Sequence, residues 1–164
     1  MEKRDLYNSN REKTGKFIYK DEEIPEGYYI LVVVIVMQNK EGRFLIQKRS
    51  KEKGGKWALT GGHPKAGESS IEGIKIEVKE ELGIDINDPI LFKKTGKKNI
   101  LCDLYYVNQD IDIKNIIMQK EEVEDVKYAS LEEIDDLFNK GEFKKSHYKM
   151  FKDGIKYLNK NKVN

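Results

Sequence analysis

Three glutamates at helical spacing follow a glycine-rich turn, and they constrain this chain more than any other feature. The turn spans residues 60–68, and Glu77, Glu80 and Glu81 lie further along the segment that follows it. Successive helical residues rotate by about 100°, so the three carboxylates fall within a wedge of about 100°. Like charges this close repel each other and weaken a helix unless a cation neutralises them. The spacing therefore predicts a divalent-metal site on one helical face.

The helix that carries these glutamates is expected over residues 69–82. Ser69 and Glu72 form a capping-box pattern at its start, and Gly83 stands where a left-handed residue would end it. An apolar stripe, rotated away from the glutamates, should dock the helix on a core; it consists of Ile71, Ile74, Val78 and Leu82. The alternative is a solvated acidic helix, which is common in a chain whose residues are 37% charged.

The spacing around this helix resembles the Nudix box. In that family a glycine, five residues, a glutamate and seven residues precede Arg-Glu-U-x-Glu-Glu-x-Gly-U, where U is aliphatic. Here the pattern starts at Gly62, continues through Glu68 and ends at Ile84, and every specified position agrees except the arginine, which is Ile76. The resemblance extends to the segments on either side of the box, at 55–62 and 126–134.

The resemblance implies an α/β fold, the Nudix-type α/β/α sandwich with a mixed β-sheet. It also implies a hydrolase that uses Mg²⁺ or Mn²⁺ to cleave the diphosphate linkage of a nucleoside diphosphate derivative, by attack of water on phosphorus. The ion would be held by Glu77, Glu80, Glu81 and the carbonyl of Gly61. Catalytic roles fall to Glu77, Glu80 and Glu68, with Glu68 orienting the site or reaching the metal through water. Carboxylates suit Mg²⁺, which prefers oxygen ligands and retains water.

The aliphatic residue at position 76 is the main departure from the family pattern. The arginine of the family is expected to pair with carboxylates of the box, which Ile76 cannot do. Lys75 and Lys79 point elsewhere around the helix. Activity is therefore reduced unless another basic residue reaches the site. The departure also favours an alternative function, a non-catalytic nucleotide-binding or regulatory module on the same fold.

Several residues outside the box are candidates for substrate binding. Arg43, His63 and Tyr28 are the main ones, and Tyr29 and Trp57 are additional pocket candidates, although Trp57 is better suited to core packing. His63 is either a loop residue near the substrate phosphates or a residue required only by the turn.

Two acidic residues in a later segment are candidates for an additional base or metal ligand. They are Glu121 and Glu122, and the alternative is that they belong to a charged, solvated loop. The second histidine, His147, lies near the start of the last expected helix and is expected to be structural.

The N-terminal segments 5–7, 14–15 and 24–29 are similar to the Nudix subgroup that includes isopentenyl-diphosphate isomerase. The sequence Gly62-His63-Pro64 also resembles a segment of that isomerase, whose cysteine would align with Gly61. Isomerisation needs an acid/base pair, and a glycine supplies no such group. Isomerase chemistry is therefore the weakest of the alternatives.

The remaining elements are expected to form a mixed sheet with helices on its faces. Strands are expected at 28–38, 43–48, 89–95, 99–107, 113–119 and 123–129, and further helices at 131–139 and 147–159. The length suits a single domain over 1–164, with 1–27 as an N-terminal extension packed on it and 160–164 frayed.

Composition narrows the partners. With 31 basic and 29 acidic residues interspersed, the chain is not expected to bind nucleic acid. The longest apolar run, 28–37, is too short for a membrane helix, and the charged N-terminus shows no secretory signal. A single cysteine, Cys102, fits a reducing cytoplasm. The expected partner is therefore a small nucleoside diphosphate derivative, and a homodimer is left open.

Overall fold

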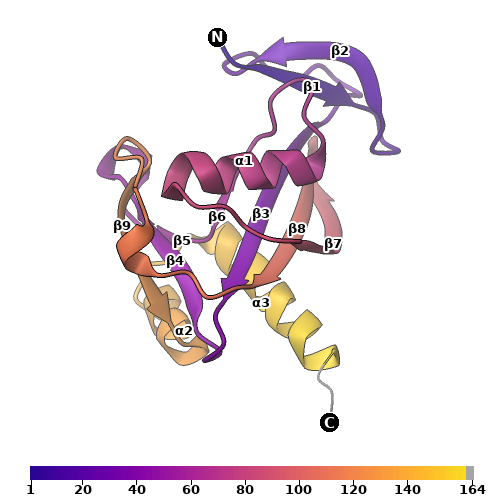
Figure 1. The fold of residues 1–164 in the computed structure, drawn as a ribbon. Coiled ribbons are helices and arrows are strands. Elements are labelled where there is room, and N and C mark those ends of the chain that lie inside the picture. Colours follow the sequence, from indigo (N-terminus) through magenta and orange to yellow (C-terminus); the bar gives the residue numbers. More distant parts are fainter. Residues whose placement is uncertain (162–164) are drawn as a thin grey trace.

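The chain assembles into a mixed sheet, a separate hairpin and three α-helices (Figure 1). The structure is a computed structural model that describes residues 1–161. The large sheet contains β3 (Ile30–Gln38), β4 (Phe44–Arg49), β5 (Trp57–Ala58), β6 (Thr60–Gly62), β7 (Ile90–Lys97), β8 (Ile100–Asn108) and β9 (Val123–Ala129). The hairpin consists of β1 (Lys3–Tyr7) and β2 (Lys13–Tyr19). The helices are α1 (Ser70–Leu82), α2 (Leu131–Asn139) and α3 (Lys145–Lys160), and two short 3₁₀ turns are η1 (Lys51–Lys53) and η2 (Ile113–Asn115).

The centre of the sheet is β3. This strand is parallel to β8 along its full length, and β8 is antiparallel to β7. On the other side, β3 pairs with β4 only where Gln38 lies opposite Phe44, and with β6 between Val33 and Ile35. β4 then continues away from β3 and pairs with β5 and β9. As a result, β6 and the residues after it occupy the edge of β3 that β4 leaves free.

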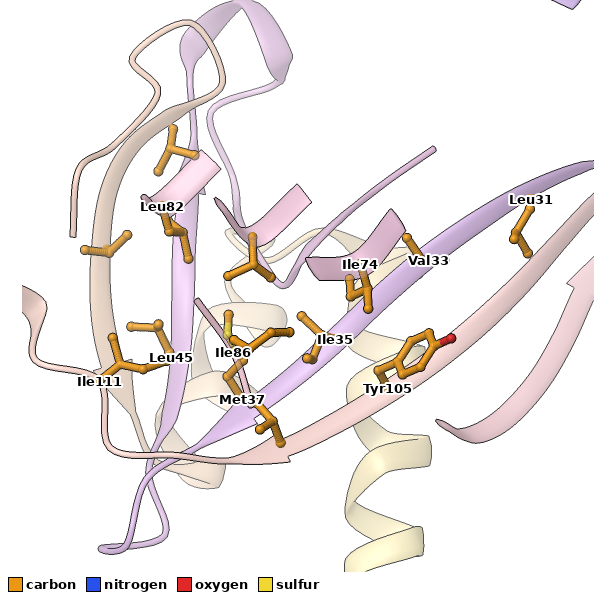
Figure 2. Close-up of a cluster of buried hydrophobic side chains, with 14 of the residues drawn as sticks. Leu31, Val33, Ile35, Met37, Leu45, Ile74, Leu82, Ile86, Tyr105 and Ile111 are labelled. Carbon is orange, nitrogen blue, oxygen red and sulfur yellow. The ribbon is translucent and has the colours of Figure 1, made fainter. Parts of the chain in front are cut away.

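Alternate residues of β3 face two apolar layers, which explains why this strand is a continuous hydrophobic run. Val33 and Ile35 belong to the layer that contains Ile74 of α1 (Figure 2). Val34 belongs to the opposite layer, with Phe151 of α3. Helix α1 thus covers one face of the sheet, and α2 and α3 cover the other. This is the α/β/α sandwich that the sequence predicted.

Helix α1 begins and ends as predicted. The side chain of Ser69 accepts a hydrogen bond from the backbone of Glu72, whose side chain accepts one in return from the Ser69 backbone. Gly83 has φ 69° and ends the helix in the left-handed conformation. Ile71 is the exception in the apolar stripe, because it is 41% exposed.

The strand predicted at 113–119 is wrong. These residues form η2 and a loop that crosses the end of α1, where the amide of Ile117 donates to the carbonyl of Leu82 and the amide of Gln119 to that of Glu81, both at 2.9 Å. Ile116 and Met118 pack on the core from this loop. The segment is apolar as a buried strand would be, but its backbone partners are the unpaired carbonyls of a helix rather than a strand.

The first 27 residues include the β1–β2 hairpin, which was not among the predicted strands. Its buried strand residues are Leu6, Tyr7 and Ile18, which give no clear alternation, and long-range contacts hold it in place. The guanidinium of Arg11 forms an ion pair with Asp103 of β8, and the Nζ of Lys13 donates to the carbonyl of Glu68 at 2.8 Å. The hairpin therefore contacts both the sheet and the turn that leads into α1.

At the other end of the chain, α3 continues to Lys160. Of the residues predicted to fray, 162–164 lie outside the described part of the chain. Within residues 1–161, the helices lack the length and apolar character that a membrane span requires.

Candidate active site

Two of the box glutamates meet beneath the sheet-facing side of α1. The carboxyl groups of Glu77 and Glu81 share a hydrogen bond, and Glu81 is almost fully buried, with a side chain 6% exposed. Burial, and then the charge of Glu81, raises the pKa of Glu77 above its usual value. Burial also raises the pKa of Glu81. Both carboxyl groups are therefore harder to ionise than exposed glutamates.

Gly62 of β6 makes room for this pair. A Cβ at this position would lie 2.5 and 2.7 Å from the two carboxylate oxygens of Glu77, well inside normal contact. The preceding Gly61 lies opposite Val34 in the sheet, and a Cβ there would meet the carbonyl of Val33 at 2.5 Å. Both glycines are thus required by close approach.

β4 contributes two polar side chains that the sequence analysis missed. The Nε2 of Gln47 donates to Oε1 of Glu81 at 2.9 Å and to the carbonyl of Leu59 at 3.3 Å. Two residues further, the Nη1 of Arg49 lies 4.0 Å from the same oxygen of Glu81. Gln47 is 1% exposed, and its Oε1 accepts no hydrogen bond. A glutamine directly after the apolar run Phe44–Ile46 was a usable signal, because an amide that is buried with such a run needs hydrogen-bond partners.

Of the two later acidic candidates, only Glu122 approaches the site. Its Oε2 accepts a hydrogen bond from Arg49 at 3.1 Å, and Lys53 lies 3.6 Å from its other oxygen. The side chain of Glu121 is exposed, and its backbone carbonyl accepts a hydrogen bond from the hydroxyl of Ser50 at 2.9 Å.

The remaining glutamates of the box have other partners. Glu80 is about half exposed and pairs with the Nζ of Lys65 at 3.0 Å, and this hydrogen bond raises the pKa of Lys65. Glu68 accepts a hydrogen bond from the backbone of Lys65 at 2.8 Å, which fixes the turn before α1. Neither carboxylate is hydrogen-bonded to the Glu77–Glu81 pair in the described residues.

The three substrate-binding candidates lie in different places. Arg43 pairs with Glu133 of α2 at 2.6 Å, at the end of β4 away from Glu81. Tyr28 accepts a hydrogen bond from Lys16 at 2.9 Å within the N-terminal part of the chain. Only His63 is adjacent to the site, directly after Gly62.

The two histidines are both held neutral. Burial, followed by the charge of Arg4, lowers the pKa of His63 to about 4. Burial lowers the pKa of His147 to about 3, and its Nδ1 accepts a hydrogen bond from the amide of Leu59 at 3.1 Å. This contact agrees with the structural role expected for His147. The additional pocket candidates pack on the apolar layers, Trp57 beside α2 and α3, and Tyr29 on the α1 side.

The predicted cluster of three metal-binding carboxylates is not assembled. Within residues 1–161, no three acidic, histidine or cysteine side chains are grouped closely enough to hold a metal ion. The structure instead presents the buried Glu81 beside the partly buried Glu77, with an ion-paired Glu80 at the periphery. The donors are all oxygen atoms, which suits Mg²⁺ or Mn²⁺.

Comparisons with known proteins assign this chain to a family. The sequence model of the NUDIX domain matches residues 28–153. The chain is 36% identical over 149 residues to an uncharacterised Nudix hydrolase of Listeria monocytogenes, and the alignment covers 87% of this chain and 88% of the relative.

Two solved structures show the same fold at lower identity. DR0079 from Deinococcus radiodurans matches with a TM-score of 0.69 and 21% identity, covering 86% of this chain and 91% of the other. The NUDIX domain of Shewanella oneidensis NrtR, solved in complex with ADP ribose, matches with a TM-score of 0.66 and 17% identity, covering 85% and 94%. Together with the box and its helix, the domain match and the Listeria relative show that this chain belongs to the Nudix hydrolase family.

Proposed function

We propose that this chain hydrolyses the diphosphate linkage of a nucleoside diphosphate derivative with a Mg²⁺ or Mn²⁺ ion held at Glu77 and Glu81. The observation that carries the proposal is the placement of the buried Glu81 carboxylate, held by Gln47, beside the partly buried Glu77 carboxylate that lies against Gly62. Two carboxylates buried together are unfavourable unless a proton or a cation lies between them. A divalent cation that displaces the proton would relieve this repulsion.

The residues present fit such an ion. Mg²⁺ is commonly bound by one or two carboxylates together with water and substrate phosphate, so the pair formed by Glu77 and Glu81 is sufficient. The carbonyl of Gly61 is proposed as a further oxygen donor. When bound, the ion would offset the negative charge of the diphosphate, which otherwise repels an attacking water.

The residues around the pair have distinct proposed roles. Lys65, on the turn before α1, is available for a substrate phosphate, and Glu80 would join the metal site when Lys65 turns away from it. Glu68 keeps that turn in place through the backbone of Lys65. Glu122 is the candidate base that would orient the attacking water.

The substrate class is proposed from the chemistry of the site and from one structural neighbour. The ADP ribose in the Shewanella domain is a nucleoside diphosphate derivative, and it is the first compound to test here. His63, a neutral imidazole next to Gly62, is the remaining candidate among those predicted to contact substrate.

The test is a screen for Mg²⁺-dependent hydrolysis of ADP-ribose, dinucleoside polyphosphates, nucleotide sugars and nucleoside triphosphates. We expect activity that EDTA abolishes and that falls at least about 100-fold in Glu81→Gln, since a charge at the reacting centre is lost. Glu132→Gln, an exposed change on α2, is the control and should be fully active.

Calorimetry with Mn²⁺ tests the ion site without substrate. The double variant Glu77→Gln/Glu81→Gln should lose the binding seen in the wild type. Equal affinity in the two proteins would refute the assignment of the ion to this pair.

A nucleotide-binding module without hydrolysis is the second candidate, and Ile76 is the feature that favours it. Under that function the wild type would bind a nucleoside diphosphate derivative in the presence of Mg²⁺ and leave it intact. The same screen, read by both binding and product formation, separates the two functions.

A further inference from the structure

The cation that is missing from α1 at position 76 has a counterpart on β4. Ile76 is partly exposed and carries no charge, and the neighbouring Lys79 pairs with Asp85 at 3.4 Å. The ion pair recorded for Glu81 within residues 1–161 is the one with Arg49, which lies 27 residues before position 76 in the sequence.

The guanidinium of Arg49 faces two carboxylates that come from different elements. Its Nη2 donates to Glu122 at 3.1 Å, and its Nη1 lies 4.0 Å from Glu81. The side chain of Arg49 is only 15% exposed, so water screens these interactions less than it screens surface ion pairs. The planar group of arginine can serve two carboxylates at once, which a lysine ammonium does less well.

Hydrogen bonds already hold the backbone in place at both glutamates, Glu81 and Glu122. The carbonyl of Glu81 accepts from Gln119 at 2.9 Å, and the carbonyl of Glu122 accepts from the amide of Ser50 at 3.0 Å. Gln47 donates to the Glu81 carboxylate from the same face of β4 as Arg49. Arg49 therefore links the tips of two side chains whose backbones are held close together. Without it, two like charges would face each other.

We propose that Arg49 is a positioning residue that holds Glu81 of α1 and Glu122 of the following loop in a fixed relation. From β4 it provides the cationic contact to the box that an arginine at position 76 would provide from the helix. Its effect on turnover rests on the proposed function, but the link between α1 and the loop does not.

The first experiment measures this link in the metal-free protein. Arg49→Met and Glu122→Gln should each lower the melting temperature. The double variant should melt no lower than the less stable of the two single variants, since both changes break the same contact. Lys53→Met is the matched control. It removes a cation from the same carboxylate but lies in a more exposed place, and it should change the melting temperature by about 2 °C or less. Additive effects of Arg49→Met and Glu122→Gln would overturn the proposal.

The second experiment measures turnover on the substrate found in the screen. We expect Arg49→Met to lower kcat by about 10- to 100-fold with KM within about threefold of the wild type, because the geometry of the reacting groups is lost. Glu122→Gln should lower kcat by at least as much, and the double variant should be slower than Glu122→Gln by less than about threefold. Arg49→Lys should recover part of kcat, and Glu132→Gln, the exposed change on α2, should leave kcat unchanged.

Two results would overturn the positioning role. A raised KM with unchanged kcat would make Arg49 a direct substrate contact, and independent effects of Arg49→Met and Glu122→Gln on kcat would separate the two residues. If the wild type hydrolyses none of the compounds, the proposed function fails, and the melting-temperature cycle alone then decides whether Arg49 links the helix to the loop.

Discussion

Replacing Gly62 with alanine is the sharpest test of the site, because the structure gives the size of the disturbance. The new Cβ would lie 2.5 and 2.7 Å from the carboxylate oxygens of Glu77, whereas ordinary contacts begin near 3.4 Å. The carboxylate must therefore move by about 1 Å. A displacement of that size at a reacting centre costs on the order of 100-fold in rate, which is about 2.7 kcal/mol of barrier.

Stability should change much less than activity in this variant. The atoms that the alanine meets belong to the end of a flexible side chain, so overpacking should cost only about 1 kcal/mol. Gly154→Ala is the matched control, because its Cβ would lie 3.1 Å from a methyl group of Val36, inside α3 and away from the glutamates. We expect this control to retain wild-type kcat and ion affinity.

The assay combines steady-state kinetics, Mn²⁺ calorimetry and thermal melting of Gly62→Ala. The expected result is a loss of kcat and of ion affinity at nearly unchanged melting temperature. Turnover and ion affinity both within about threefold of the wild type would show that the position of Glu77 does not limit the reaction, and the reasoning from the close approach would be wrong.

Three further predictions concern pH and chemistry. The pKa of Glu77 is raised in the folded state, so the metal-free protein should lose stability as pH rises from about 4.5 towards that raised pKa; melting curves should show a flatter pH dependence with Mg²⁺ and in Glu77→Gln. The pKa of His147 is lowered to about 3, so the stability of the protein should fall as pH drops below the ordinary pKa of 6.5. His147→Phe should weaken this acid dependence. Urea unfolding at pH 7 should show that the variant is about 1–3 kcal/mol less stable, because the amide of Leu59 loses its acceptor. Because Gly61 supplies no acid or base, NMR should detect no dimethylallyl diphosphate when the protein and Mg²⁺ are incubated with isopentenyl diphosphate, and its formation in proportion to enzyme would contradict this prediction.

The helix and the central strands could be predicted because their signals are local. The capping box at Ser69 and the left-handed end at Gly83 are read directly from neighbouring residues, and both are present. The loop at 113–119 could not be distinguished from a strand, because it contains the short apolar run Ile116–Met118 while its backbone hydrogen bonds go to α1. The β1–β2 hairpin buries few residues and depends on contacts with distant residues, which no local pattern reports.

The site was only partly predictable for the same reason. The spacing of the box brought Glu77 and Glu81 together, but it could not show that Glu80 would pair with Lys65. Arg49 contacts the box only because β4 passes beside the end of α1 in the folded chain. Such a partner has no fixed spacing from the motif, so its role follows from the fold alone.

The loop before β9 cannot be treated as an interchangeable module. The amides of Ile117 and Gln119 complete the hydrogen bonds of the last turn of α1, and three residues later the loop delivers Glu122. A graft from a relative would have to end the helix and present the carboxylate at the same spacing. The length from 117 to 122 is therefore fixed by the helix it closes.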